Sequence, residues 1–124
     1  MRPADLAASP LVIFPREKAP GLHDDILGLF TAVGASPEIG QEAIQMQTIL
    51  SLVAAGLGVA VVPASLRNLG RVGVEYRALT GDVPSVEIAL AWRGPAPGAA
   101  LARFIEHVSR QPYAQARAVR KPAL

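Results

Sequence analysis

Two polar stretches of the chain carry residue types suited to binding a small anion. The first is the loop PREKAPGL at residues 15–22, in which Arg16 supplies a cation and Gly21 lets the backbone approach a ligand closely. The second is QMQT at residues 45–48, where amide and hydroxyl side chains open an apolar segment. A helix that begins at either stretch presents unpaired backbone N–H groups and a partial positive charge. The expected chemistry is anion binding, at about 0.3–1 kcal/mol for each exposed helix terminus.

The chain lacks the residue patterns of common catalytic and metal sites. It contains no cysteine, which excludes disulfides, thiolate nucleophiles and cysteine-based zinc sites. Its serines lie outside G-x-S-x-G turns, and the glycines of GLGVA at residues 56–60 precede a strand instead of opening a helix as a phosphate loop does. We interpret His23 and His107 as solvated surface residues. We therefore expect no enzymatic activity, no metal and no cofactor.

The composition favours one compact domain without a DNA-binding surface. With 124 residues, 51% of them hydrophobic, the chain can bury one core but not two. The formal net charge of +2 is small and the basic residues are scattered, whereas phosphate neutralisation favours a basic stripe. No apolar run reaches the ~18 residues of a membrane span, and residues 1–10 lack a signal-like apolar segment. We expect a cytoplasmic chain with no membrane contact and no direct DNA contact.

The stretch at residues 45–63, QMQTILSLVAAGLGVAVVP, is expected to form the centre of the fold. Its apolar residues leave almost no polar face, which predicts a helix enclosed on most sides. Gly56 and Gly58 supply the turn that ends this helix, and residues 59–62 then run apolar without alternation, as in a strand covered on both faces. A buried helix that turns tightly into such a strand is half of a parallel β-α-β unit. The predicted fold class is therefore α/β.

Further elements flank this unit in alternating order. Apolar runs bounded by proline and glycine predict strands, and apolar stripes at helical spacing predict helices. The expected elements are a strand at 11–14, a helix at 22–33, a strand at 38–42, a helical turn at 64–70, strands at 72–79 and 86–93, and a helix at 99–111.

These residues also carry a family resemblance. QEAIQMQTILSLVAAGLGVAVVPASL, at residues 41–66, is similar to the segment of LysR-type transcriptional regulators where xxLVAAGxGVxxVPAS is highly characteristic. LVIFPREKAPGLHDDILGLF before it and VEIALAWR after it extend the resemblance to roughly residues 11–111. The resemblance implies a type 2 periplasmic-binding-protein-like α/β fold, in which two subdomains enclose an effector cleft.

By this resemblance the chain contains parts of two subdomains. We expect residues 11–85 to form effector-binding subdomain II as a complete β-α-β-α-β unit, and residues 86–111 to be the return strand and helix of subdomain I. Residues 1–10 are expected to be a leader, and residues 112–124 a flexible tail. The winged helix-turn-helix of such regulators is expected outside this chain. We expect the return helix, without its own lobe, to fold back, to pair with another copy, or to be poorly ordered.

The resemblance also implies which residues face the effector. Regulators of this family that respond to aromatic acids and their breakdown products place the segment matching residues 19–22 against the effector, and residues 47 and 48 match a second wall of the same cleft. From the pattern alone, the same positions are more simply turn residues and solvated helix residues, and only the resemblance makes the effector role as favourable. With the cation of the loop included, the candidate effector-binding residues are Pro20, Gly21, Leu22, Gln47, Thr48 and Arg16.

The function that follows is ligand sensing. We expect the effector-binding portion of a LysR-type transcriptional regulator, which binds a small organic anion such as an aromatic or dicarboxylic acid and works as a homo-oligomer. Two other interpretations stay open. One is an interaction fragment that pairs with intact regulators, and the other is a periplasmic-type solute-binding module, which the lack of a signal sequence disfavours.

Overall fold

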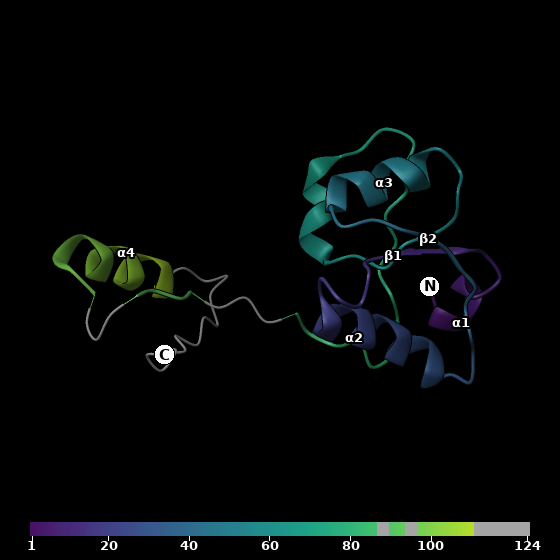
Figure 1. Cartoon of the computed structure of the whole chain (residues 1–124), viewed down its shortest axis with the longest axis horizontal. Helices are drawn as coiled ribbons and strands as arrows, with labels where there is room; N and C mark the ends of the chain where they lie inside the picture. Colours follow the sequence, from purple (N-terminus) through teal and green to yellow (C-terminus); the bar gives the residue numbers. More distant parts are fainter. Residues whose placement is uncertain (87–89, 94–96, 111–124) are drawn as a thin grey trace. The chain divides into compact units, whose positions relative to one another are not determined.

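The computed structural model describes residues 1–86, 90–93 and 97–110 of the chain. The chain divides into two compact units, residues 1–86 and residues 87–124. The elements in chain order are α1 (Pro3–Leu6), β1 (Leu11–Ile13), α2 (Pro20–Thr31), β2 (Ile39–Glu42), α3 (Met46–Ala54), the 3₁₀ helix η1 (Ala64–Leu69) and α4 (Ala99–Ser109) (Figure 1). All but α4 belong to the first unit.

The sheet of the first unit is small and parallel. β1 pairs with β2, with Leu11 opposite Ile39. On its other side, Leu11 forms a parallel bridge with Val59, after α3. There the Val12 N–H donates to the Val59 carbonyl at 2.8 Å, and the Val59 N–H donates to the Pro10 carbonyl at 2.9 Å. β1 therefore lies between β2 and the chain that follows α3, which confirms the predicted parallel β-α-β order for these segments.

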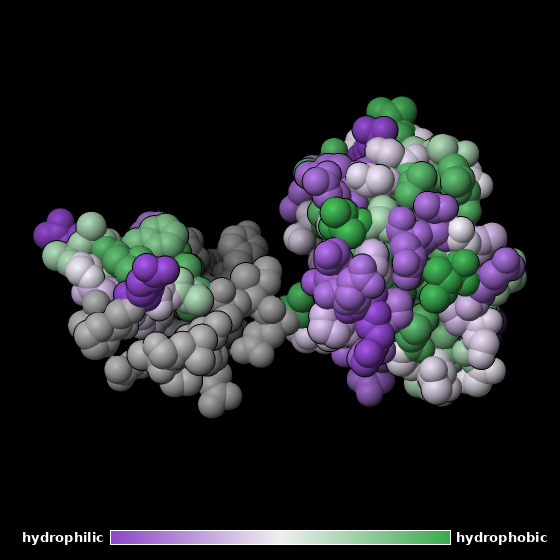
Figure 2. Space-filling model, viewed as in Figure 1, coloured by the Kyte–Doolittle hydropathy of each residue, from purple (hydrophilic) through white to green (hydrophobic). Residues whose placement is uncertain are grey.

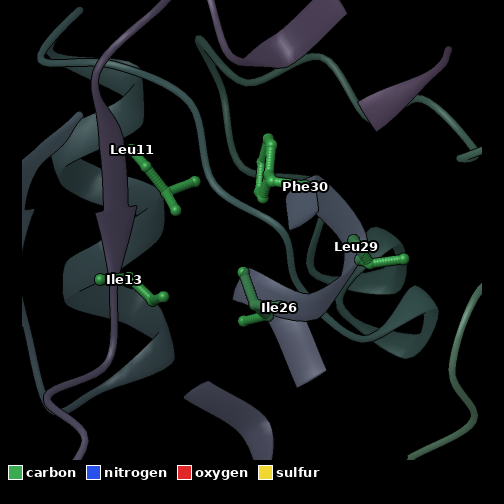
Figure 3. Close-up of a cluster of buried hydrophobic side chains, with 5 residues drawn as sticks. All are labelled: Leu11, Ile13, Ile26, Leu29 and Phe30. Atoms are coloured by element: carbon green, nitrogen blue, oxygen red, sulfur yellow. The ribbon is translucent and has the colours of Figure 1, made fainter. Parts of the chain in front are cut away.

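Helix α2 covers one face of β1. Leu11 and Ile13 form an apolar cluster with three residues of the helix, Ile26, Leu29 and Phe30 (Figure 3). The three helical residues follow the spacing that gives a helix one apolar face. Leu11 and Phe30 are fully buried, so this cluster is the centre of the core.

Helix α3 covers the opposite face (Figure 1). Val12 and Phe14, which alternate with Leu11 and Ile13 along the strand, form a second buried cluster with Ile49. Successive side chains of a strand point to opposite faces, so β1 is buried on both sides by two helices. The predicted buried parallel strand is confirmed.

Helix α3 is less enclosed than its composition predicts. Ile49 and Leu50 are buried, but the side chain of Leu57, just after the helix, is 45% exposed. Residues 59–62 are only half-buried and form one bridge instead of the predicted strand. The predicted full enclosure of the helix and the predicted strand are therefore wrong, although side chains of residues 59–62 border both apolar clusters and so have partial cover on both faces. The physical reason is that, in the part of the chain that the structure describes, no further strand pairs with residues 59–62.

The segment predicted as a strand at residues 72–79 is irregular. It begins with a turn at Gly73, whose φ of +84° is a left-handed conformation that favours glycine. Its end is held by the start of the chain, because the Met1 ammonium donates to the Ala78 carbonyl and the Thr80 N–H donates to the Met1 carbonyl, both at 3.0 Å. The first ten residues, interpreted as a leader, thus include α1 and a backbone link to this segment.

The second unit contains α4, close to the predicted helix at 99–111. Its apolar stripe is only partly covered: Leu101, Ile105 and Val108 are half-buried, no residue of α4 is fully buried, and Phe104 is 52% exposed. Figure 2 shows apolar surface on the visible side of this helix. Of the predicted strand at 86–93, residues 87–89 lie outside the described residues and residues 90–93 form no strand. The predicted tail at 112–124 also lies outside them.

Candidate functional site

Helices α2 and α3 begin at the same edge of the sheet. α2 follows β1 through residues 14–19, and α3 follows β2 through residues 43–45. Because the two strands are parallel, their carboxyl ends lie at one edge. Among the described residues, no side chain caps the first N–H groups of α2 after Ala19 or of α3 after Gln45. This carboxyl edge, made of residues 14–22 and 43–48, therefore presents two uncapped helix N-termini to an anion.

Phe14 joins the two helix starts. Phe14 directly follows β1, and its side chain is buried in the second apolar cluster. Leu22 of α2 and Met46 of α3 border the same cluster. Ala19 and Ala43, from the two loops, pack there as well. The carboxyl edge thus has an apolar floor that holds both loops.

Three of the predicted effector residues open α2. Pro20 and Gly21 are exposed, and Pro20 suits the first helical position because the N–H that it lacks would have no partner within the helix. A Cβ atom added at Gly21 would meet nothing within 4 Å, so packing does not require glycine there. Leu22 is half-buried and borders both apolar clusters, so its side chain also serves the core.

The other helix start carries Gln47 and Thr48, both exposed in the first turn of α3. Gln47 lines a shallow hollow of about 220 Å³ together with Leu50, Leu69 and Arg71. The structure therefore brings Gln47 beside an arginine that the sequence analysis missed. No periodic pattern links Arg71 to α3, because the connecting chain is irregular after η1.

Arg16, the cation of the loop after β1, is already paired. Its Nε lies 2.8 Å from Oδ1 of Asp24, and its Nη2 lies 2.9 Å from Oδ2 of the same carboxylate. Hydrogen bonds from the guanidinium hold the pKa of Asp24 below its usual range, and the same bonds raise the pKa of Arg16. An anion that binds Arg16 at both Nε and Nη2 must displace Asp24.

His23 is buried, so its prediction as a solvated residue is wrong. Its side chain is 5% exposed, and Nδ1 lies 2.7 Å from the carbonyl oxygen of Phe14. The carbonyl can only accept, so Nδ1 is the protonated donor. The strand ends at Phe14, and the imidazole supplies the hydrogen bond that this buried carbonyl would otherwise lack. His107, the other histidine, is on the exposed side of α4.

The described residues offer binding groups rather than a reaction centre. Within residues 1–86, 90–93 and 97–110, no three His, Asp or Glu side chains are grouped so that they could hold a metal ion. In the same residues, no helix is long and apolar enough to cross a bilayer. What the carboxyl edge provides is helix N-termini, an arginine and an apolar floor, which together suit a small organic anion.

Comparison with known proteins agrees with this arrangement. The family model described as the LysR substrate binding domain matches residues 1–112. The HTH-type transcriptional regulator IlvR of Caulobacter vibrioides is 57% identical over 94 residues, which cover 73% of this chain and 31% of IlvR. The regulator TcbR of Pseudomonas sp. strain P51 is 34% identical over 107 residues, which cover 86% of this chain and 36% of TcbR.

The regulator CatR of Pseudomonas putida is 38% identical over 76 residues, covering 61% of this chain and 26% of CatR. The chain thus spans about a third of the length of the curated relatives it matches. These relatives are transcriptional regulators, which points to regulation rather than catalysis. The family implies a periplasmic-binding-protein-like α/β fold, and the parallel sheet between two helices fits it. The chain belongs to the LysR substrate-binding domain family.

Proposed function

We propose that this chain is the effector-binding portion of a LysR-type transcriptional regulator, and that it binds a small organic anion at the carboxyl edge. An aromatic or dicarboxylic acid has the charge and the apolar body that this edge suits. The observation that carries the proposal is the meeting of two uncapped helix N-termini over one apolar floor. The contacts that we assign are Pro20, Gly21, Leu22, Gln47, Thr48 and Arg16.

The energetics indicate that this edge is one wall of a larger site. Each helix terminus favours an anion by about 0.3–1 kcal/mol when exposed, and by up to ~2 kcal/mol when partly buried. A micromolar dissociation constant requires about −8 kcal/mol, which needs apolar contact on a second side. We assign residues 11–85 to subdomain II and residues 86–111 to the return segment of subdomain I. The rest of subdomain I then supplies the second wall, in a regulator that is cytoplasmic and contacts DNA through a winged helix-turn-helix outside this chain.

Gly21 gives the sharpest test of the site. Gly21→Val places a branched side chain at the exposed start of α2, where space is open and the fold is expected to persist. Gly28→Val is the matched control, because Gly28 is exposed in the same helix and also has open space around it. The ¹⁵N-labelled chain is titrated with benzoate and with cis,cis-muconate, and amide shifts are followed by NMR.

The expected result is saturable shifts of the amides of residues 21, 22 and 46–48. Gly21→Val should remove them and Gly28→Val should keep them. Benzyl alcohol, which lacks the charge, should leave these amides unshifted. Shifts confined to other residues, or equal binding by the wild type and Gly21→Val, would contradict the assigned site.

A second role, an interaction fragment that pairs with intact regulators, is favoured by α4. Its apolar stripe is only half-buried and leaves Phe104 exposed, and exposed apolar surface favours association. Light scattering of the chain alone tests for a homo-oligomer, and mixing with an intact relative tests for mixed oligomers. A monomer that forms no mixed species would rule out this role.

A further inference from the structure

Arg16 is occupied by a carboxylate that belongs to the chain itself. Its guanidinium holds Asp24 at two points, with Nε to Oδ1 at 2.8 Å and Nη2 to Oδ2 at 2.9 Å. Arginine uses the same two-point geometry to hold the carboxylate or phosphate of a ligand. Asp24 therefore fills the Nε–Nη2 edge of Arg16, one of the edges at which a guanidinium can hold a carboxylate ligand at two points.

The ion pair of Arg16 and Asp24 is placed so that a ligand carboxylate can replace Asp24 without loss of the fold. The side chains of Arg16 and Asp24 are 68% and 51% exposed, and exposed ion pairs of this kind are screened by solvent and salt. The path of the loop is held separately, by the hydrogen bond from His23 to the Phe14 carbonyl at 2.7 Å. Opening the pair thus frees Arg16 while the end of β1 stays tied to the first turn of α2.

We propose that Asp24 is a built-in competitor, which sets the effector affinity of the carboxyl edge by occupying Arg16 until an effector carboxylate displaces it. This inference rests on the proposed function and adds a residue that opposes binding. It also requires an effector with a carboxylate or similar anion that engages Nε and Nη2 of the guanidinium in place of Asp24.

Asp25 provides the matched control. It is exposed, carries the same charge one residue further along α2, and none of the interactions among the described residues joins it to Arg16. Asp24→Asn and Asp25→Asn therefore remove the same charge from the same turn of the helix. Only Asp24→Asn removes the strong carboxylate partner of Arg16.

Dissociation constants are measured by NMR titration of the full 124-residue chain with benzoate. Asp24→Asn should bind benzoate up to about fivefold more tightly than the wild type, because an exposed ion pair is screened by solvent and competes only weakly. Asp25→Asn should change the affinity by less than about twofold. Arg16→Ala should bind benzoate more weakly than the wild type. Adding Asp24→Asn to Arg16→Ala should not restore the affinity.

Equal gains in Asp24→Asn and Asp25→Asn would overturn the proposal, since a general charge effect would then suffice. A gain that persists in the Arg16→Ala background would overturn it too. Equal affinity of the wild type and Asp24→Asn overturns this inference and leaves the proposed function standing, whereas absence of binding by every variant overturns both.

A second readout follows the displaced carboxylate directly. At pH 7 and saturating benzoate, the ¹³C resonance of the Asp24 carboxyl should move to the position that it has in Arg16→Ala. A merely structural ion pair would leave that resonance in place while benzoate binds. If the Asp24 resonance does not move at saturating benzoate, the proposed displacement of Asp24 is overturned.

Discussion

Gly58→Ala should destabilise the first unit strongly, because the backbone of Pro10 leaves no room for a side chain there. An added Cβ atom would lie 2.1 Å from the carbonyl oxygen of Pro10 and 3.0 Å from its carbonyl carbon. Gly58 also has a φ of +152°, a conformation that residues with a side chain rarely adopt. The clash is with main-chain atoms, so a change of side-chain rotamer cannot relieve it.

The magnitude follows from what must move. Shifting Pro10 away from residue 58 breaks the hydrogen bond from Val59 to Pro10 at 2.9 Å and strains the one from Val12 to Val59 at 2.8 Å. Two such bonds contribute about 0.5–1.5 kcal/mol each, and the strained backbone adds roughly 1–3 kcal/mol. The expected loss of unfolding free energy is therefore about 2–6 kcal/mol. This is a large share of the ~5–15 kcal/mol typical of a domain.

Urea denaturation followed by far-ultraviolet circular dichroism measures this loss. Gly56→Ala is the control, because Gly56 also has a positive φ, of +79°, but nothing lies within 4 Å of its added Cβ. It should cost only the left-handed strain of about 1–2 kcal/mol. If Gly58→Ala is no more destabilising than Gly56→Ala, the close approach of Pro10 is not what requires glycine.

Three further predictions concern the core and the carboxyl edge. Phe30→Ala should lower the free energy of unfolding by about 3–5 kcal/mol, while Phe104→Ala, at a half-exposed position, should cost well under half as much in the same denaturation assay. His23→Phe should cost about 1–3 kcal/mol because it leaves a buried carbonyl unpaired, and a neutral result would contradict the hydrogen bond to that carbonyl. Arg16 lowers the pKa of Asp24, so the ion pair should stabilise the chain above the ordinary aspartate pKa and this contribution should vanish as the pH falls through the lowered value. A stability difference between the wild type and Asp24→Asn that persisted at lower pH would count against this assignment.

Most helices and the paired strands could be predicted because their signals are local. The buried strand at residues 11–14 is a short apolar run closed by proline, and α2 and α4 show apolar stripes at helical spacing. The parallel order of the strands could also be predicted, because a helix that turns tightly into an apolar segment leaves few chain topologies other than a parallel β-α-β unit. The strand expected at 72–79 did not form, since strand pairing depends on a neighbour that local pattern cannot supply.

The candidate site was predictable only in part. The resemblance and the loop composition pointed to Gly21 and Gln47 at two helix starts, and both lie at the carboxyl edge. Arg71, which shares a hollow with Gln47, was missed because an irregular segment carries it there. His23 was misjudged because a lone histidine in a polar stretch gives no sign that a strand ends against it.

The sequence by itself determined roughly where α2, α3 and α4 lie, which strand is buried and which family the chain resembles, since each of these depends on neighbours along the chain. The tertiary structure alone decided that two helix N-termini meet at one edge, that Asp24 occupies Arg16, and that α3 keeps an open side. The physical reason is that burial and ion pairing depend on which segments meet in space. In this chain the parallel pairing of β1 with β2 and with Val59 determines which segments lie side by side.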